Sequence, residues 1–219
     1  MTFASSALAA ALALASTTPA ARADAHAHAD EPADTQRVEV PPQLVLLDRS
    51  QRRIQTFGMA TLTAWSIANI VGGVAGNLAT PRGDPLRYAH QMNAMWNTVN
   101  LTLGAIGLAN ARRERGVIGR RLGVAAEVAK TQRVFAVNAL LDVLYILGGY
   151  ATWEVGRARE SPRLVGYGGA VILQGAFLMA FDLGMIAAHE RNLRRRLPGY
   201  AIAPAPTPGG AALVLRGAF

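Results

Sequence analysis

Four apolar segments, each roughly twenty residues long, constrain this chain more than any other feature. They cover residues 57–78, 92–111, 133–153 and 167–188. About twenty helical residues are needed to cross roughly 30 Å of hydrocarbon. A soluble helical bundle would need a polar outer face on every helix, and these segments carry too few charges to supply one. We therefore predict an all-α fold, a four-helix transmembrane bundle within residues 57–190.

The segments before this bundle have their own character. Residues 1–25 resemble a secretory signal peptide, with an apolar stretch followed by small residues suited to cleavage after Ala23 or Ala25. The first six residues contain no Lys or Arg, so an uncleaved anchor is an equally open interpretation. Residues 26–56 are acidic at first and contain Pro41-Pro42, which should break any helix. We expect a flexible linker there.

The end of the chain has a different composition. Residues 191–219 begin with a cluster of arginines and continue with Pro204, Pro206, Pro208 and Gly209-Gly210. This composition predicts a disordered tail. The basic segment 112–132 carries apolar residues at helical spacing, so it either lies on lipid headgroups or extends the third helix.

The distribution of charge predicts which partners the chain meets. The net charge is +8, from 22 Lys+Arg against 14 Asp+Glu. The basic residues gather at the ends of the apolar segments, where anionic lipid headgroups are the nearest partners. They form no basic face interleaved with aromatic residues, so we expect no nucleic-acid binding. The lipid bilayer is the predicted partner, and a homo-oligomer or a second membrane protein is left open.

The same charges conflict with the signal-like start over sidedness. Arginines are concentrated before the first segment, between the second and third, and after the fourth. The positive-inside rule would place both ends of the bundle in the cytoplasm. A cleaved signal peptide would place the residues before the first segment outside. Both orientations therefore stay open.

Polar residues recur at helical spacing inside each apolar segment. Unsatisfied amides and carboxylates are costly in hydrocarbon, so we expect these side chains to face inward and to bond to one another. The predicted intramembrane polar cluster consists of Asn69, Asn97, Asn100, Asn138, Asp142, Gln174 and Asp182.

Asp142 and Asp182 support two interpretations. Burial disfavours the charged form of a carboxylic acid, which suits a site that binds and releases a proton or a cation. Alternatively, the polar cluster is structural and fixes the register of the helices, at about 0.6 kcal/mol per hydrogen bond on average. An intramembrane acid protease would also use two aspartates, but the residues beside these two lack the glycine-rich flexibility expected for one.

Other chemistry has little support in the sequence. The chain has no cysteine, which excludes thiolate nucleophiles and Cys-ligated metals. Cleavage of the signal-like segment would place His26 or His28 near a new amino terminus, where a Cu(II) or Ni(II) site is conceivable. The simpler interpretation is a polar linker, so we predict no cofactor, no metal and no enzymatic activity.

Two blocks carry a resemblance to a known family. They are the segment Gln91-Met92-Asn93-Ala94-Met95-Trp96-Asn97-Thr98-Val99-Asn100 and the segment Gln174-Gly175-Ala176-Phe177-Leu178-Met179-Ala180-Phe181-Asp182. With shorter blocks they resemble, from about Arg52 to Asp182, an uncharacterised bacterial family of small four-helix membrane proteins. The resemblance implies a single four-helix unit and, with the helix composition, a bacterial inner membrane. It implies no activity.

The leading prediction is therefore a non-enzymatic integral membrane protein whose polar core is mainly structural. It would serve as a subunit or scaffold of a membrane assembly. The alternative is a proton- or ion-conducting or transport element that uses Asp142 and Asp182.

Overall fold

The computed structural model describes residues 42–113, 124–198, 200–207 and 210–217. The predicted signal-like segment, His26 and His28 lie outside these residues. The described elements are α2 (Pro42–Ala79), α3 (Pro85–Arg113), α4 (Val124–Ala158), α5 (Pro162–Arg196), β1 (Tyr200–Thr207) and β2 (Gly210–Gly217). Each predicted apolar segment lies within one of these four helices.

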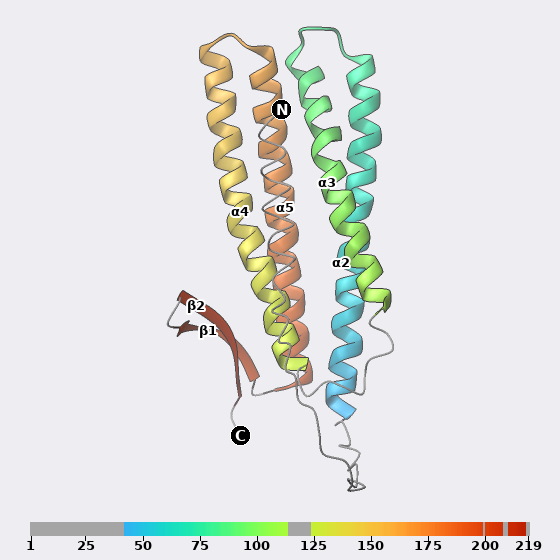
Figure 1. Cartoon of the computed structure of the whole chain (residues 1–219), viewed down its shortest axis with the longest axis vertical. Coiled ribbons are helices and arrows are strands. Elements are labelled where there is room, and N and C mark those ends of the chain that lie inside the picture. The colour runs from blue at the N-terminus through green and yellow to red at the C-terminus, as the bar shows by residue number, and fades with distance from the viewer. Residues whose placement is uncertain (1–41, 114–123, 199, 208–209, 218–219) are drawn as a thin grey trace, which may run out of the picture. The chain divides into compact units, whose positions relative to one another are not determined.

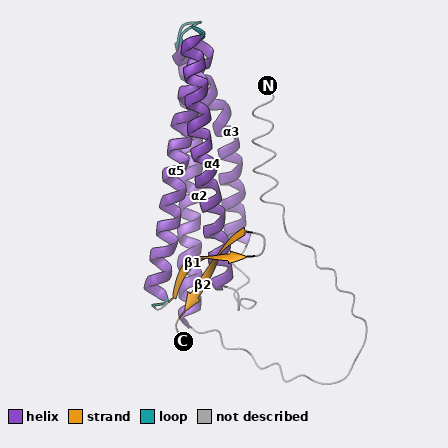
Figure 2. Ribbon diagram, turned by 90° about the vertical axis from the view of Figure 1, so that its left-hand side faces the viewer, coloured by secondary structure: helices purple, strands orange, loops and turns teal. Residues whose placement is uncertain are grey.

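The helices form two antiparallel pairs, α2 with α3 and α4 with α5, that run side by side (Figure 1). The turns within the two pairs lie at the same end of the bundle, which we call the turn end (Figures 1 and 2). Helix α5 packs against the other three, whereas α4 makes little contact with α2. The central position of α5 makes it the helix best placed to connect the bundle.

Local sequence explains both turns. Gly83 adopts a φ of 90°, which favours glycine, and the Asp84 carboxylate accepts a hydrogen bond from the backbone N–H of Leu86. In the second turn, the Ser161 hydroxyl accepts from the backbone N–H of Leu164. Both helices that follow begin with proline, which has no N–H to leave unpaired at a helix start. The turns are therefore short and well defined.

The helices are longer than the predicted spans, and the prediction of a flexible linker is wrong over residues 42–56 for that reason. Helix α2 begins at Pro42, so residues 42–56 are helical and not a flexible linker. We expected Pro41-Pro42 to break a helix, but Pro42 occupies the first helical position, which proline tolerates. Helix α4 already begins at Val124, which agrees with the second of the two interpretations of the basic segment.

The end of the chain also differs from the prediction of disorder. Helix α5 continues to Arg196, and β1 and β2 pair as an antiparallel hairpin, with Tyr200 opposite Gly217 and Thr207 opposite Gly210. Prolines are compatible with β1 because, in a two-stranded sheet, each strand has one edge that needs no N–H donor. Strand β1 contacts α5, and β2 contacts α4.

Over much of the bundle, apolar side chains are exposed and polar side chains are buried, which is the reverse of a soluble protein. Large apolar side chains are exposed on all four helices, among them Phe57, Val71, Ile106, Leu140 and Leu173. Amides and carboxylates are buried at the same levels, among them Asn97, Asn100, Asp142, Gln174 and Asp182. A soluble protein normally buries apolar side chains and exposes polar ones. The arrangement is that of a protein solvated by lipid.

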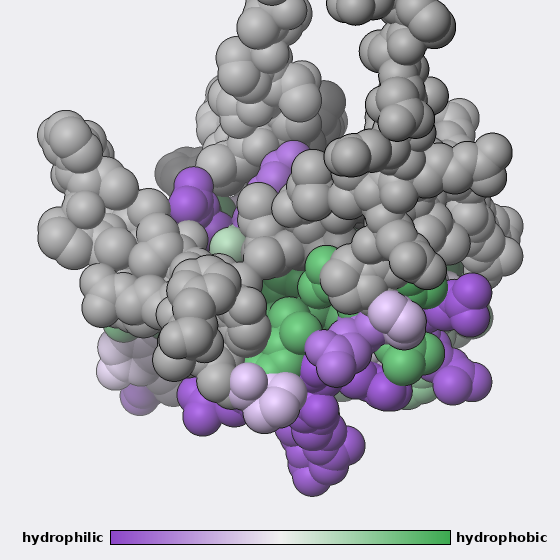
Figure 3. Space-filling view, turned by 90° about the horizontal axis from the view of Figure 1, so that it is seen from below, coloured by the Kyte–Doolittle hydropathy of each residue, from purple (hydrophilic) through white to green (hydrophobic). Residues whose placement is uncertain are grey.

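The opposite end of the bundle, which we call the basic end, has ordinary polarity. Its interior is an apolar cluster of Leu47, Val128, Leu193 and Leu197, all buried. Its exposed residues include Arg49, Arg53, Lys130, Arg133, Arg191 and Arg194. Figure 3 views this end and shows hydrophilic residues gathered around a smaller hydrophobic area. The basic end therefore has the polarity of a helical bundle that is surrounded by water.

Three of the described helices, α2, α4 and α5, are long and apolar enough to cross a membrane. The prediction of a helical, membrane-integrated fold is confirmed to that extent. Helix α3 does not meet the same standard of apolarity, because its amides lower its average hydropathy.

Candidate functional site

Gln174 on α5 connects three helices through its side-chain amide. Its Oε1 accepts a hydrogen bond from the indole Nε1 of Trp65 on α2 at 3.1 Å. Its Nε2 donates to Oδ1 of Asn69 on α2 at 3.2 Å and to Oδ1 of Asn93 on α3 at 3.0 Å. Gln174 is fully buried, and the three hydrogen bonds of its side chain all go to residues of other helices. Gln174 thus links α5 to the α2–α3 pair.

Neighbouring polar residues satisfy their donors mainly within one helix. Asn97 donates to the backbone carbonyl of Asn93, and Asn100 donates to Oδ1 of Asn97 at 3.3 Å. The Ser66 hydroxyl donates to the carbonyl of Leu62, four residues earlier on α2. These groups are buried but already paired, so they form a neutral polar lining that holds no charge of its own.

Asp142 on α4 and Asp182 on α5 lie together in the interior. They are 3% and 4% exposed, and their side chains share a hydrogen bond. Gly175 makes the close approach of α4 and α5 possible, because a Cβ at this position would lie 3.2 Å from the Asp142 carbonyl oxygen. Two carboxyl groups can be joined by a hydrogen bond only if one of them carries a proton.

The environment of this carboxyl pair supplies no compensating cation. Within the described part of the chain, no salt bridge reaches either residue. Oδ2 of Asp142 is buried and has no hydrogen-bond partner among the residues that the structure describes. Tyr145 lies one turn along α4 from Asp142, and the centre of its ring lies 5.0 Å from that of Trp96 on α3. The pair therefore has one unsatisfied acceptor in an otherwise neutral interior.

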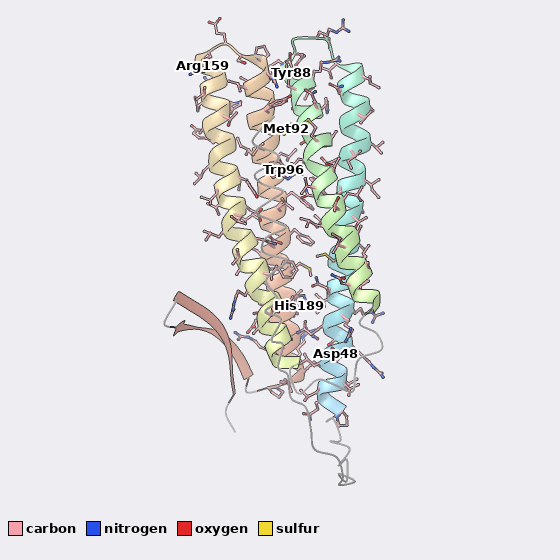
Figure 4. All side chains as sticks on the ribbon, in the orientation of Figure 1. Asp48, Tyr88, Met92, Trp96, Arg159 and His189 are labelled. Atoms are coloured by element: carbon pink, nitrogen blue, oxygen red, sulfur yellow. The ribbon has the colours of Figure 1, made fainter. Side chains whose placement is uncertain are left out.

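Aromatic residues follow α3 on the side that faces the other pair of helices. Figure 4 shows Tyr88, Met92 and Trp96 in sequence along this side. The ring of Tyr88 lies 6.0 Å from that of Tyr167 on α5. The hydroxyl of Tyr167 in turn donates to Oε1 of Gln91 at 2.9 Å, in an exposed position. Polar and aromatic contacts between α3 and α5 are thus also present near the turn end of the bundle.

An apolar layer lies on the other side of the carboxyl pair. Met59 of α2, Phe135 of α4 and Met185 of α5 form one buried cluster. Partly buried apolar residues from α2, α3 and α5 pack against it: Ile54, Leu108, Phe181 and Ile186. Gly58 and Gly107 leave room for the side chains of Met185 and Met59, respectively. All four helices therefore contribute to this layer.

A second polar group lies beyond the apolar layer. His189 of α5, which is labelled in Figure 4, hydrogen-bonds through Nδ1 to Oε1 of Gln51. Its Nε2 lies 3.3 Å from Oε1 of Gln55, and its ring stacks 6.0 Å from the ring of Phe135. Gln132 adds a contact of 3.4 Å to Glu190. This group lies nearer the basic end than the carboxyl pair does.

The predicted cluster is thus only partly one unit. The structure brings Asn69 together with Gln174, Asn97 with Asn100, and Asp142 with Asp182. Asn138 is half-buried and makes no side-chain hydrogen bond to the described residues. Sequence reasoning missed Trp65, Ser66, Gln51, Gln55 and His189. The seven-residue spacing between Asp182 and His189 could have indicated that His189 is buried, because it places both residues on one face of α5.

A bound metal ion fits this site poorly. Among the described residues, no three His, Asp or Glu side chains are grouped so that they could hold a metal ion. The amide oxygens of Asn69, Asn93, Asn97 and Gln174 already accept hydrogen bonds. A hard cation takes about six or more oxygen ligands, and the described side chains around the pair do not provide that many free oxygens. A proton requires only one acceptor.

Comparison with known proteins identifies a matching family but no activity. The model of a family of unknown function matches residues 61–183, from the middle of α2 to just beyond Asp182. This match agrees with the resemblance to an uncharacterised family. No curated protein and no solved structure gives a significant match to the chain.

Proposed function

We propose that this chain, which belongs to the family of unknown function DUF6992, is a four-helix membrane protein. We further propose that it binds and releases a proton at the carboxyl pair. The observation that carries the proposal is the direct contact of Asp142 and Asp182 in an interior where the described residues supply no basic partner. Ionisable groups inside a membrane are costly and commonly mark proton pathways. The role assigned is binding rather than catalysis.

The arrangement of α3 supports a fourth crossing of the membrane. A short turn joins α3 to α2, and the two helices pack antiparallel over their length. Large apolar residues are exposed along α3: Leu86, Met95, Leu103 and Ile106. Its amides Asn97 and Asn100 are buried. A helix can be moderately polar on average and still cross a bilayer if its polar residues face the protein.

The basic end supports an assignment for the membrane boundary. Its exposed arginines would meet anionic headgroups, and its apolar interior resembles that of a soluble helical bundle. Helix α2 has 38 residues, or roughly 57 Å at the helical rise, which exceeds the hydrocarbon thickness. We therefore place the excess length of α2, α4 and α5 outside the hydrocarbon at this end.

Infrared spectroscopy tests the proton-binding role directly. The carbonyl stretch of a protonated carboxylic acid is separate from that of a carboxylate. We expect wild-type protein to show a carboxylic acid band that titrates as pH is varied from 5 to 8, and the double variant Asp142→Asn/Asp182→Asn to lack it. Substitution of Asp48, which lies near the basic end (Figure 4), should leave the band in place. A band unchanged by the double substitution would refute the proposal.

A second candidate is that the polar interior serves only to hold a membrane scaffold together. The specific observation that favours it is the bonding of Gln174 to both α2 and α3. In this case no carboxylic acid band would titrate between pH 5 and 8, and Asp→Asn variants would keep most of their stability. The infrared measurement therefore separates the two functions.

A further inference from the structure

The carboxyl pair lies between two unlike surroundings along the bundle. Toward the turn end, the backbone of Asp142 packs against Gly175, the neighbour of Gln174. Gln174 bonds to Asn93, Asn97 donates to the backbone carbonyl of Asn93, and Asn100 donates to Oδ1 of Asn97. Buried amides of α3 and α5 therefore line the interior on this side of the pair.

Toward the basic end, the succession of polar groups is interrupted. Phe135 precedes Asp142 by seven residues on α4, so it lies on the same face and about 10 Å closer to the basic end. Met185 follows Asp182 by three residues on α5. These two residues and Met59 are buried together, and the next polar side chain along α5 is His189. The layer therefore separates the pair from His189 and its glutamine partners.

We infer that the carboxyl pair exchanges its proton with the turn end alone, because the apolar layer of Met59, Phe135 and Met185 closes the route to the basic end. This inference rests on the proposed proton-binding function. A hydrophobic constriction excludes water, and without water or polar groups a proton has no path. The wild-type bundle is then a one-sided proton-binding site, and loosening of the layer is the step that would convert it to a conductor.

A proton-leak assay in lipid vesicles tests the inference. Full-length protein is reconstituted with a trapped pH-sensitive dye, and the decay of an imposed pH difference is followed with the membrane potential clamped. The test variant Met59→Gln/Met185→Gln makes the layer polar at nearly unchanged side-chain size. The matched control Met59→Leu/Met185→Leu keeps the layer apolar. Met185→Gln alone serves if the double variant does not fold.

We expect the Gln variant to dissipate the pH difference several-fold faster than wild type, and the Leu variant to match wild type. Adding Asp142→Asn/Asp182→Asn to the Gln variant should restore the slow decay. Equal decay in wild type and the Gln variant would overturn the inference that the layer is the barrier, even if the infrared titration of the pair is observed. A fast decay that persists without the two carboxyls would retain the layer as the barrier and overturn the inference that the route to it passes through the pair.

Discussion

The indole Nε1 of Trp65 on α2 donates a hydrogen bond to Oε1 of Gln174 on α5 across 3.1 Å, and the two residues are 109 positions apart in the chain. The same amide group also bonds to Asn69 and Asn93. Next to this contact, the ring of Trp65 stacks on Phe177 with a centroid distance of 3.8 Å. One turn of α5 therefore makes both a polar and an aromatic contact with α2, and this pairing determines how the two helical pairs meet.

Removal of the Gln174 amide should destabilise the bundle. Gln174→Leu keeps the side chain large but leaves Trp65, Asn69 and Asn93 without their partner. At about 0.6 kcal/mol per interhelical bond, the three bonds imply a loss of about 2 kcal/mol in the free energy of unfolding. Unfolding in mixed detergent micelles measures it. Leu173→Ala, at the exposed neighbouring position, should change stability much less, and equal effects of the two substitutions would contradict the assignment.

The carboxyl pair should tolerate an amide better than a truncation. In Asp142→Asn the amide can still donate a hydrogen bond to Asp182, so we expect little change in stability. Asp142→Ala leaves Asp182 buried without its partner, at a cost of about 1–3 kcal/mol. The double variant Asp142→Ala/Asp182→Ala should lose less than the sum of the two single losses. Strict additivity in this cycle of unfolding measurements would mean that the two carboxyls do not interact.

Two adjacent glycines on α5 should respond in opposite ways to the same substitution. A Cβ at Gly168 would lie 2.6 Å from the carbonyl oxygen of Gly149 on α4, so Gly168→Ala should cost about 1–3 kcal/mol through overpacking. Among the described residues, no atom of another helix lies within 4 Å of a Cβ at Gly169. Gly169→Ala should therefore be neutral or stabilise the helix by up to about 1 kcal/mol. Thermal melting of the two purified variants gives the comparison, and similar losses would show that α4 and α5 are not packed this closely.

The proposed crossing of α3 can be tested with single cysteines, because the chain contains none. Met95 is exposed on α3 and should face lipid, whereas Gly83 lies in the turn between α2 and α3. A membrane-impermeant maleimide should modify Gly83→Cys readily in vesicles opened to both sides. Met95→Cys should react with it at least several-fold more slowly, and should react fully once the protein is unfolded in denaturing detergent. Fast labelling of Met95→Cys in the membrane would place α3 outside the hydrocarbon.

Much of the helical architecture was predictable from local sequence. Long apolar segments separated by Pro, Gly and charged residues predict helices and turns, because helix length and hydropathy are properties of consecutive residues. The polar spacing of Asp182 and Gln174 correctly indicated that they face the interior. Helix ends were less predictable. Pro42 both disrupts a preceding helix and begins a new one, and composition alone does not distinguish the two.

The sequence by itself determined that the chain is helical, that its helices suit a bilayer, and that polar side chains must be buried somewhere among them. Only the tertiary structure decided which of them meet. Asp142 and Asp182 touch because Gly175 lets α4 and α5 approach, and Gln174 reaches two helices because α5 packs against both α2 and α3. The apolar layer of Met59, Phe135 and Met185 likewise combines residues that are far apart in the chain. Periodicity specifies the face of a helix on which a residue lies, but the rotation and depth of one helix against another depend on packing between segments that share no local signal.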